Sequence, residues 1–119
     1  MNWSVKKVGE KCIIEVPQNI LEDEVSESLK ELMQDMADDG FKMFYLDMNR
    51  ISKANSKSLA AIIHLYKFAA YYDIEIRLFN LQPYVYQLIY QTRLNQIFDI
   101  CESDYSVMDS CFNQALKTA

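Results

Sequence analysis

The sequence has very little glycine, with two residues in a chain of 119. Loops that cradle phosphate groups, such as GxGxxG and the P-loop, need several glycines at fixed spacing. A nucleotide-binding loop of this kind is therefore excluded. Proline also occurs only twice, and the sequence shows neither an internal repeat nor a low-complexity tract. We therefore expect one domain over residues 1–119.

Metal-binding patterns are missing too. His64 is the only histidine, and the three cysteines (Cys12, Cys101 and Cys111) form no CxxC pair. Zinc sites need clustered cysteines or histidines, and a disulfide framework needs an even number of cysteines. We therefore expect no metal site, no cofactor, and three reduced thiols in a cytoplasmic protein.

Positive charge is scarce as well. Twelve lysines and arginines stand against seventeen aspartates and glutamates, which gives a formal net charge of −5. A protein that binds nucleic acid or an anionic membrane surface needs a basic face. The charge balance argues against both classes of partner and is compatible with a basic protein partner. No apolar run approaches the length needed to cross a membrane, so we expect no membrane insertion.

Half of the residues are apolar, and their spacing predicts alternating strands and helices. Residues 3–16 are typical of a hairpin that turns at Gly9-Glu10. The spacing further predicts strands over 41–48, 74–79 and 97–101, and helices over 21–39, 56–72, from 83 and over 104–117. This order predicts an α/β domain with a mixed, mostly parallel sheet of four to five strands packed with four to five α-helices.

The second predicted helix begins at a polar stretch, residues 53–58, that runs into an apolar segment. Asn55, Ser56 and Ser58 could each cap the helix, because an Asn or Ser oxygen accepts a hydrogen bond from a free N–H of the first turn. A capped helix start is one interpretation. The other is a regulatory site, since a phosphate on a first-turn hydroxyl would face the positive end of the helix dipole between Lys53 and Lys57.

A catalytic site is poorly supported. Ser56 and His64 are the one serine–histidine pair near this junction, and eight residues of helix separate two positions by about 12 Å. That distance is far beyond hydrogen-bond reach. Asp47 ends a predicted strand, but no second acid is placed to work with it. We therefore expect no enzymatic activity.

Residues 46–100 resemble the STAS domain, the fold shared by anti-sigma-factor antagonists and the cytosolic tails of sulfate transporters. The resemblance rests on three segments in order: YLDMNRI at 45–51, FNLQP at 79–83 before a short helix, and LNQIFDI at 94–100. The predicted order of elements agrees over nearly the whole chain. The resemblance implies a single STAS-like domain over residues 1–119.

The family signature at the start of the second helix is Asp-Ser-Ser-Gly-Leu. In this chain Asn55 takes the place of the aspartate, Ser56 of the first serine, Lys57 of the second serine and Ser58 of the glycine. In antagonist members the first serine is phosphorylated by a partner kinase that is also the anti-sigma factor, and the unphosphorylated form binds that kinase. By resemblance, Ser56 is the expected phosphoacceptor.

The resemblance implies a non-enzymatic regulator that binds a serine kinase, the anti-sigma factor, and is switched by phosphorylation. The expected contacts with this partner are Lys53, Asn55, Ser56, Lys57, Ser58 and Asn80. The alternative is an unphosphorylated STAS scaffold subunit of a signalling complex or of a lipid-transport ATPase complex. Asn55 lacks the charge of aspartate and Ser58 the freedom of glycine, which favours the alternative. Two further family glycines are missing, near Gln18 and at Arg93.

Overall fold

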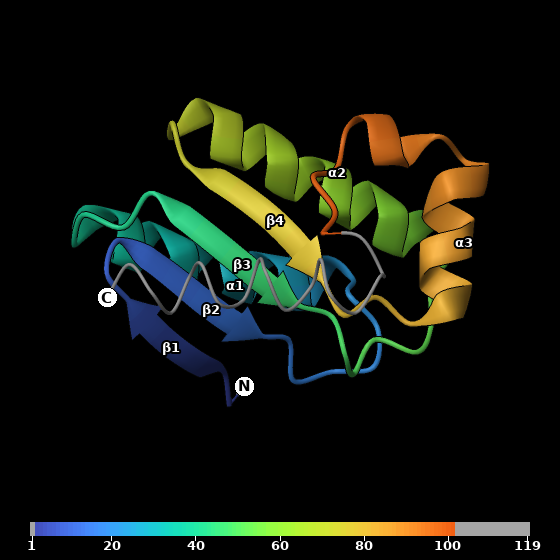
Figure 1. The fold of residues 1–119 in the computed structure, drawn as a ribbon, viewed down its shortest axis with the longest axis horizontal. Coiled ribbons are helices and arrows are strands. Elements are labelled where there is room, and N and C mark those ends of the chain that lie inside the picture. The colour runs from blue at the N-terminus through green and yellow to red at the C-terminus, as the bar shows by residue number, and fades with distance from the viewer. Residues whose placement is uncertain (1, 102–119) are drawn as a thin grey trace.

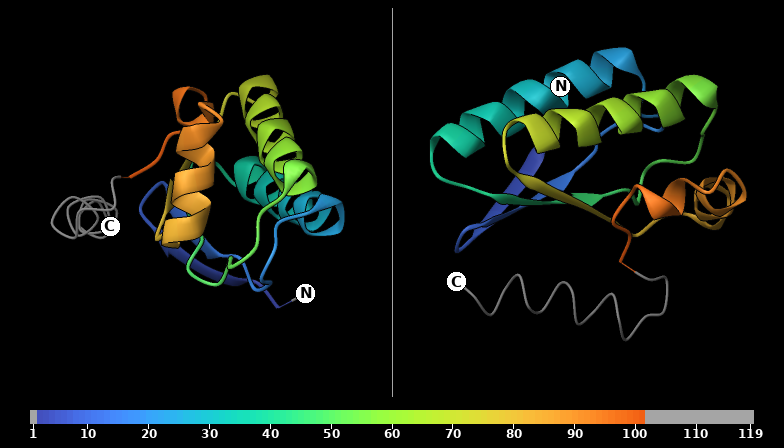
Figure 2. Two further views of the ribbon diagram at one scale, coloured as in Figure 1. Left: turned by 90° about the vertical axis from the view of Figure 1, so that its right-hand side faces the viewer. Right: turned by 90° about the horizontal axis from the view of Figure 1, so that it is seen from above.

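The computed structural model describes residues 2–101 (Figures 1 and 2). The helix predicted over residues 104–117 lies outside the described residues. The elements in chain order are β1 (Ser4–Val8), β2 (Lys11–Glu15), α1 (Asp23–Asp38), β3 (Met43–Asp47), α2 (Ser56–Tyr71), β4 (Glu75–Phe79), α3 (Pro83–Gln91) and the 3₁₀ helix η1 (Leu94–Gln96). The predicted α/β class is confirmed, and for the strands and helices up to β4 no boundary differs from its prediction by more than two residues.

The four strands form one sheet in the order β1-β2-β3-β4. β1 pairs antiparallel with β2, whereas β2 with β3 and β3 with β4 are parallel. Parallel neighbours need a long crossover between them, and α1 and α2 supply these crossovers. The prediction of a mixed, mostly parallel sheet is therefore confirmed.

The strand predicted over residues 97–101 is reduced to a single bridge. Ile100 pairs in parallel with Leu78, and the N–H of Cys101 donates to the Leu78 carbonyl at 2.9 Å. A side chain replaces further pairing: the Tyr66 hydroxyl accepts the N–H of Asp99 at 2.9 Å and donates to the Ile76 carbonyl at 3.0 Å. The segment is thus held against β4 by the Tyr66 hydroxyl and by two backbone hydrogen bonds of Leu78, which donates to the Asp99 carbonyl at 2.8 Å and accepts the Cys101 N–H.

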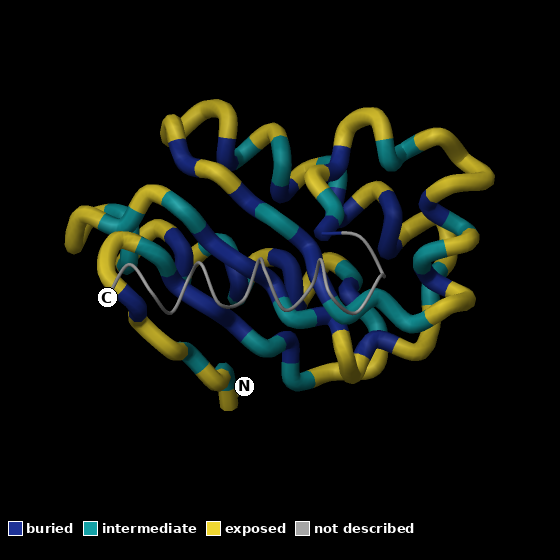
Figure 3. Tube along the Cα trace, in the orientation of Figure 1, coloured by how far each residue is buried: buried dark blue, intermediate teal, exposed yellow. Residues whose placement is uncertain are grey.

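Helices α1 and α2 cover one face of the sheet (Figure 2). Because side chains alternate between the two faces of each strand, every second residue of a strand faces these helices. The side chains that face these helices form the main core; from the three parallel strands they are Cys12, Ile14, Phe44, Leu46, Ile76 and Leu78. A second buried group on the opposite face consists of Val8, Ile13, Tyr45, Phe79 and Cys101. Figure 3 shows buried residues along all three parallel strands, so the loops between the elements are placed by a packed body.

Strands β2, β3 and β4 point the same way, so the loops that follow them meet at one end of the sheet (Figure 1). These loops, residues 16–22, 48–55 and 80–82, are called the carboxyl edge here. They lead into α1, α2 and α3, so three helix N-termini lie at this edge. Parallel sheets commonly bind their partners there, and the polar stretch at residues 53–58 is part of it.

Candidate functional site

Ser56 and Ser58 have opposite environments at the start of α2. Ser58 is only 2% exposed, whereas Ser56 is exposed. The Ser58 hydroxyl accepts the N–H of Asn55 at 2.7 Å and donates to its carbonyl at 2.9 Å. The Asn55 side-chain oxygen in turn accepts the N–H of Ser58 at 2.9 Å, which completes a capping box. Asn55 and Ser58 therefore cap the helix, and the Ser56 hydroxyl is left facing solvent.

Ser58 stays a predicted partner contact, and the structure gives its surroundings. Its side chain is buried and both of its hydrogen-bonding roles are used within the cap. A glycine is not required for the backbone at this position, since Ser58 lies inside α2 and is not among the positive-φ residues. Ser58 holds the start of α2 in place for its exposed neighbours.

The loops after β3 and β4 are joined by side chains. One Asp47 carboxylate oxygen accepts the N–H of Asn49 at 3.0 Å and the side-chain amide of Asn80 at 3.2 Å. The side-chain amide of Gln82 donates to the Asn49 carbonyl at 2.8 Å. Asn80 itself adopts a left-handed backbone with φ of 58°, a conformation that asparagine tolerates better than most residues. The half-buried Asn80 thus connects the loop after β4 to the end of β3 through its hydrogen bond to Asp47.

The loop before α2 is also joined to the loop before α1. The N–H groups of Ser52 and Lys53 donate to the Asn19 carbonyl at 2.9 and 3.1 Å, and the side-chain amide of Asn55 donates to a Glu22 carboxylate oxygen at 3.3 Å. Sequence reasoning did not identify Asn19 or Glu22. Their only signal was their position directly before α1, which a parallel sheet brings to the same edge.

The charges around Ser56 are mixed. Lys53 and Lys57 are exposed and close to Ser56 in the chain. Lys57 also lines a pocket of about 210 Å³ whose other charged residues are Glu22, Asp23 and Glu24, at the start of α1. The surface near Ser56 therefore carries charges of both signs.

Two shifted pKa values belong to residues outside these loops. Burial raises the pKa of the Cys12 thiol on β2 to about 11 and raises that of the Tyr66 hydroxyl on α2 well above its usual range. His64 is exposed on α2. Within residues 2–101, no group of three or more His, Cys, Asp or Glu side chains could hold a metal ion.

The structure thus brings the predicted site residues to one edge. Lys53, Asn55, Ser56 and Lys57 are exposed there, Asn80 lies half-buried on the neighbouring loop, and Ser58 is buried beneath them. None of the helices in the described part of the chain is long and apolar enough to span a bilayer. The edge is therefore a polar surface of exposed hydroxyl, amide and ammonium groups on loops that are hydrogen-bonded to one another.

Solved structures share this fold. One is a Thermotoga maritima protein assigned as an anti-sigma factor antagonist (TM-score 0.69, 20% identity, 91% of this chain and 92% of that chain covered). A second is the Bacillus cell fate determinant SpoIIAA in its phosphorylated form (0.58, 12%, 89% and 96%). A third is the murine anion transporter Slc26a9 (0.65, 20%, 92% and 18%). At these identities the likeness establishes the fold alone.

A comparison with curated protein sequences gave no match. The family model of the STAS domain, in contrast, matches residues 2–116, nearly the whole chain. The chain belongs to the STAS domain family.

Proposed function

We propose that this protein is a non-enzymatic regulator in the cytoplasm that resembles an anti-sigma-factor antagonist. It binds a serine kinase that is also an anti-sigma factor, and phosphorylation of Ser56 ends this binding. The observation that carries the proposal is that different residues at the start of α2 cap the helix and face the solvent. Ser58 and Asn55 form the cap, and Ser56 presents an exposed hydroxyl next to them.

The reacting group that this chain supplies to the switch is the Ser56 hydroxyl oxygen. The Ser56 hydroxyl oxygen forms a bond to the γ-phosphorus of ATP held by the kinase, the bond to the β-phosphate oxygen breaks, and ADP leaves. The hydroxyl proton passes to a base of the kinase. The product carries about −1.5 to −2 charges near neutral pH. Because the surrounding loops are tied by hydrogen bonds, the partner meets a changed charge on an unchanged surface.

The second candidate is an unphosphorylated scaffold subunit of a signalling complex or a lipid-transport ATPase complex. The observation that favours it is Asn55, which caps the helix as an aspartate would but carries no charge. The similarity to a domain within an anion transporter is compatible with it. The two candidates differ in whether Ser56 is ever modified.

The test is to incubate the full chain with ATP and serine kinases encoded in the same genome, and to measure the intact mass. We expect one phosphate on the wild type and none on Ser56→Ala. Ser52→Ala is the matched control, because Ser52 is also exposed on the loop before α2 and should leave the phosphate in place. No adduct with any kinase, together with stable co-purification with a membrane ATPase, would favour the scaffold.

A further inference from the structure

Glu22 and Asn55 connect the starts of the two helices that cover the sheet. Glu22 is the N-cap residue of α1 and Asn55 is the N-cap residue of α2. The side-chain amide of Asn55 donates to a Glu22 carboxylate oxygen at 3.3 Å. The Asn55 oxygen is already used by the N–H of Ser58, so its NH₂ group is the end of the side chain that faces Glu22.

This contact makes the identity of residue 55 depend on residue 22. An aspartate at position 55 would cap α2 equally well, but its second oxygen would replace the nitrogen that now lies 3.3 Å from the Glu22 oxygen. Two ionised carboxylates at that distance disfavour each other. An amide at position 55 therefore fits a carboxylate at position 22.

We propose that Glu22 supplies a carboxylate next to Asn55, the residue that precedes Ser56, and that the Asn55 amide holds it there. The negative charge that the family signature places just before the phosphoacceptor is thus retained at this edge, on a residue that precedes another helix. Glu22 is half-buried and lines the same pocket as Lys57, the residue that follows Ser56. Glu22 is given no contact with the reacting atoms, so it is a positioning residue. The inference rests on the proposed phosphorylation of Ser56.

The experiment exchanges the two groups. The kinase that phosphorylates the wild type is assayed with Glu22→Gln, Asn55→Asp, the double variant Glu22→Gln/Asn55→Asp, and Glu24→Gln. The double variant restores one carboxylate and one amide with the direction of the hydrogen bond reversed. Glu24→Gln is the matched control, because Glu24 lines the same pocket and, within residues 2–101, the carboxylate that the Asn55 amide contacts is that of Glu22.

We expect Glu22→Gln to lower kcat/KM for Ser56 phosphorylation about tenfold, and the double variant to regain at least half of that loss on a logarithmic scale. Glu24→Gln should stay within about twofold of the wild type. Asn55→Asp should unfold at a lower temperature than the double variant, because only Asn55→Asp places two carboxylates together.

Two outcomes overturn the inference while leaving the proposed function intact: a wild-type rate for Glu22→Gln, or a double variant no better than Glu22→Gln. A merely structural role for Glu22 predicts that kcat/KM falls only as far as the folded fraction does, and thermal unfolding of each variant measures that fraction. Failure of every kinase to phosphorylate the wild type is the separate result that refutes the proposed function, and the inference with it.

Discussion

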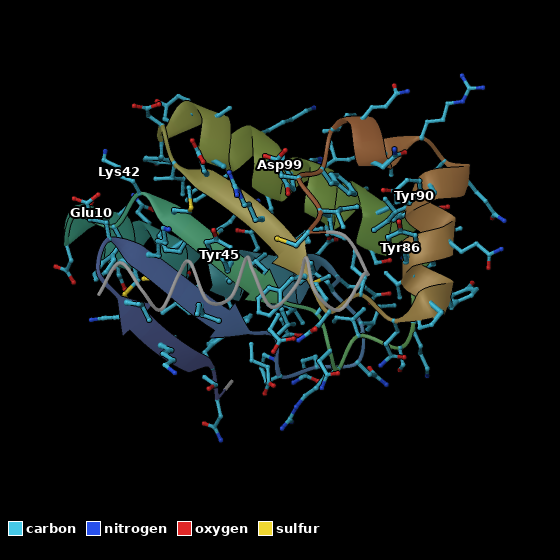
Figure 4. The ribbon with its side chains drawn as sticks, viewed as in Figure 1. Glu10, Lys42, Tyr45, Tyr86, Tyr90 and Asp99 are labelled. Atoms are coloured by element: carbon cyan, nitrogen blue, oxygen red, sulfur yellow. The ribbon has the colours of Figure 1, made fainter. Side chains whose placement is uncertain are left out.

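The two ends of the parallel strands differ in two properties. The amino ends have the larger cavity, whereas the carboxyl ends have loops that are joined by side-chain hydrogen bonds. At the amino ends, away from Ser56, lies a groove of about 430 Å³, whereas the pocket at the carboxyl edge has about 210 Å³. The larger groove is lined by Glu10, Lys11, Lys42, Met43, Asp73, Ile74 and Glu75. Figure 4 labels Glu10 and Lys42 at that end of the sheet. Of these two cavities, volume alone would favour the one at the amino ends as a binding site.

The hydrogen bonds favour the other end. At the carboxyl edge, side chains join each loop to its neighbour, through Asp47 with Asn80 and Asn55 with Glu22. At the amino ends the N–H of Glu75 donates to the backbone carbonyl of residue 42 at 2.8 Å. Within residues 2–101, however, no charged side chain that lines this groove forms a hydrogen bond or an ion pair. A surface held in one conformation loses less entropy when a protein binds it. Preorganised loops therefore favour the carboxyl edge over the amino ends as the candidate partner-binding surface.

The largest expected effect contrasts a charge change at each end. Ser56→Asp should weaken binding of the partner kinase about a hundredfold, because unfavourable charges placed inside an interface cost several kcal/mol. Lys42→Glu changes the charge at the amino ends and should leave the affinity within about threefold of the wild type. Isothermal titration calorimetry with both variants measures the difference. Equal affinities of Ser56→Asp and the wild type for the kinase would contradict the proposed phosphorylation switch.

The regular part of the fold could be predicted from the sequence because its signals are local. Apolar spacing placed β3 and α2 to within two residues of their observed bounds, and the hairpin turn follows from Gly9 with φ of 61°. The segment 97–101 was predicted as a strand and shows only one bridge. Its apolar residues satisfy a strand pattern, but the Tyr66 hydroxyl takes up the N–H of Asp99. A hydrogen bond between residues 33 positions apart leaves no local signal.

A smaller effect is expected from the cap beneath Ser56. Ser58→Ala removes the acceptor of the Asn55 N–H in a buried environment, which should lower the free energy of unfolding by about 2 kcal/mol. Ser56→Ala removes an exposed hydroxyl and should change it by less than about 0.5 kcal/mol. Urea unfolding of the two variants compares them directly. Equal losses would show that the two serines do not have the separate roles assigned to them.

The next effect tests the support from the loop after β4. Asn80→Ala removes the hydrogen bond to Asp47 and places alanine at a φ of 58°, which together should cost about 1.5 kcal/mol. Asn80→Gly removes the same hydrogen bond and relieves the backbone, so its cost should be about 0.5 kcal/mol. Chemical unfolding gives both values. A glycine variant as unstable as the alanine variant would mean that the left-handed backbone is not strained.

The site was only partly predictable because its residues come from three loops. The polar stretch before α2 indicated Lys53, Asn55, Ser56 and Lys57, and all four are exposed at the carboxyl edge. Capping propensity could not separate Ser56 from Ser58, since both are good capping residues; the resemblance selected Ser56, and burial distinguishes the two in the structure. Glu22 could not be found from its own segment, where it is one of three successive acidic residues.

The smallest expected effect belongs to the amino ends, where β2 begins with Lys11 and the buried Cys12. Burial raises the pKa of the Cys12 thiol from 9.0 to about 11, with a smaller opposing effect from Lys7. The folded state therefore keeps a proton that the unfolded state loses, and this contribution to stability is present below pH 9 and is lost as pH rises toward 11. Between pH 8 and 9.5 the loss should be about 0.8 kcal/mol. The pKa of Tyr66 is raised too, but it affects stability mainly above pH 10.

Urea titrations at pH 8 and 9.5 test this contribution. In Cys12→Ala most of the difference in unfolding free energy between the two pH values should disappear, whereas Ser56→Ala, at the opposite edge, should retain it. A Cys12→Ala protein with an unchanged pH dependence would assign the loss of stability to other groups.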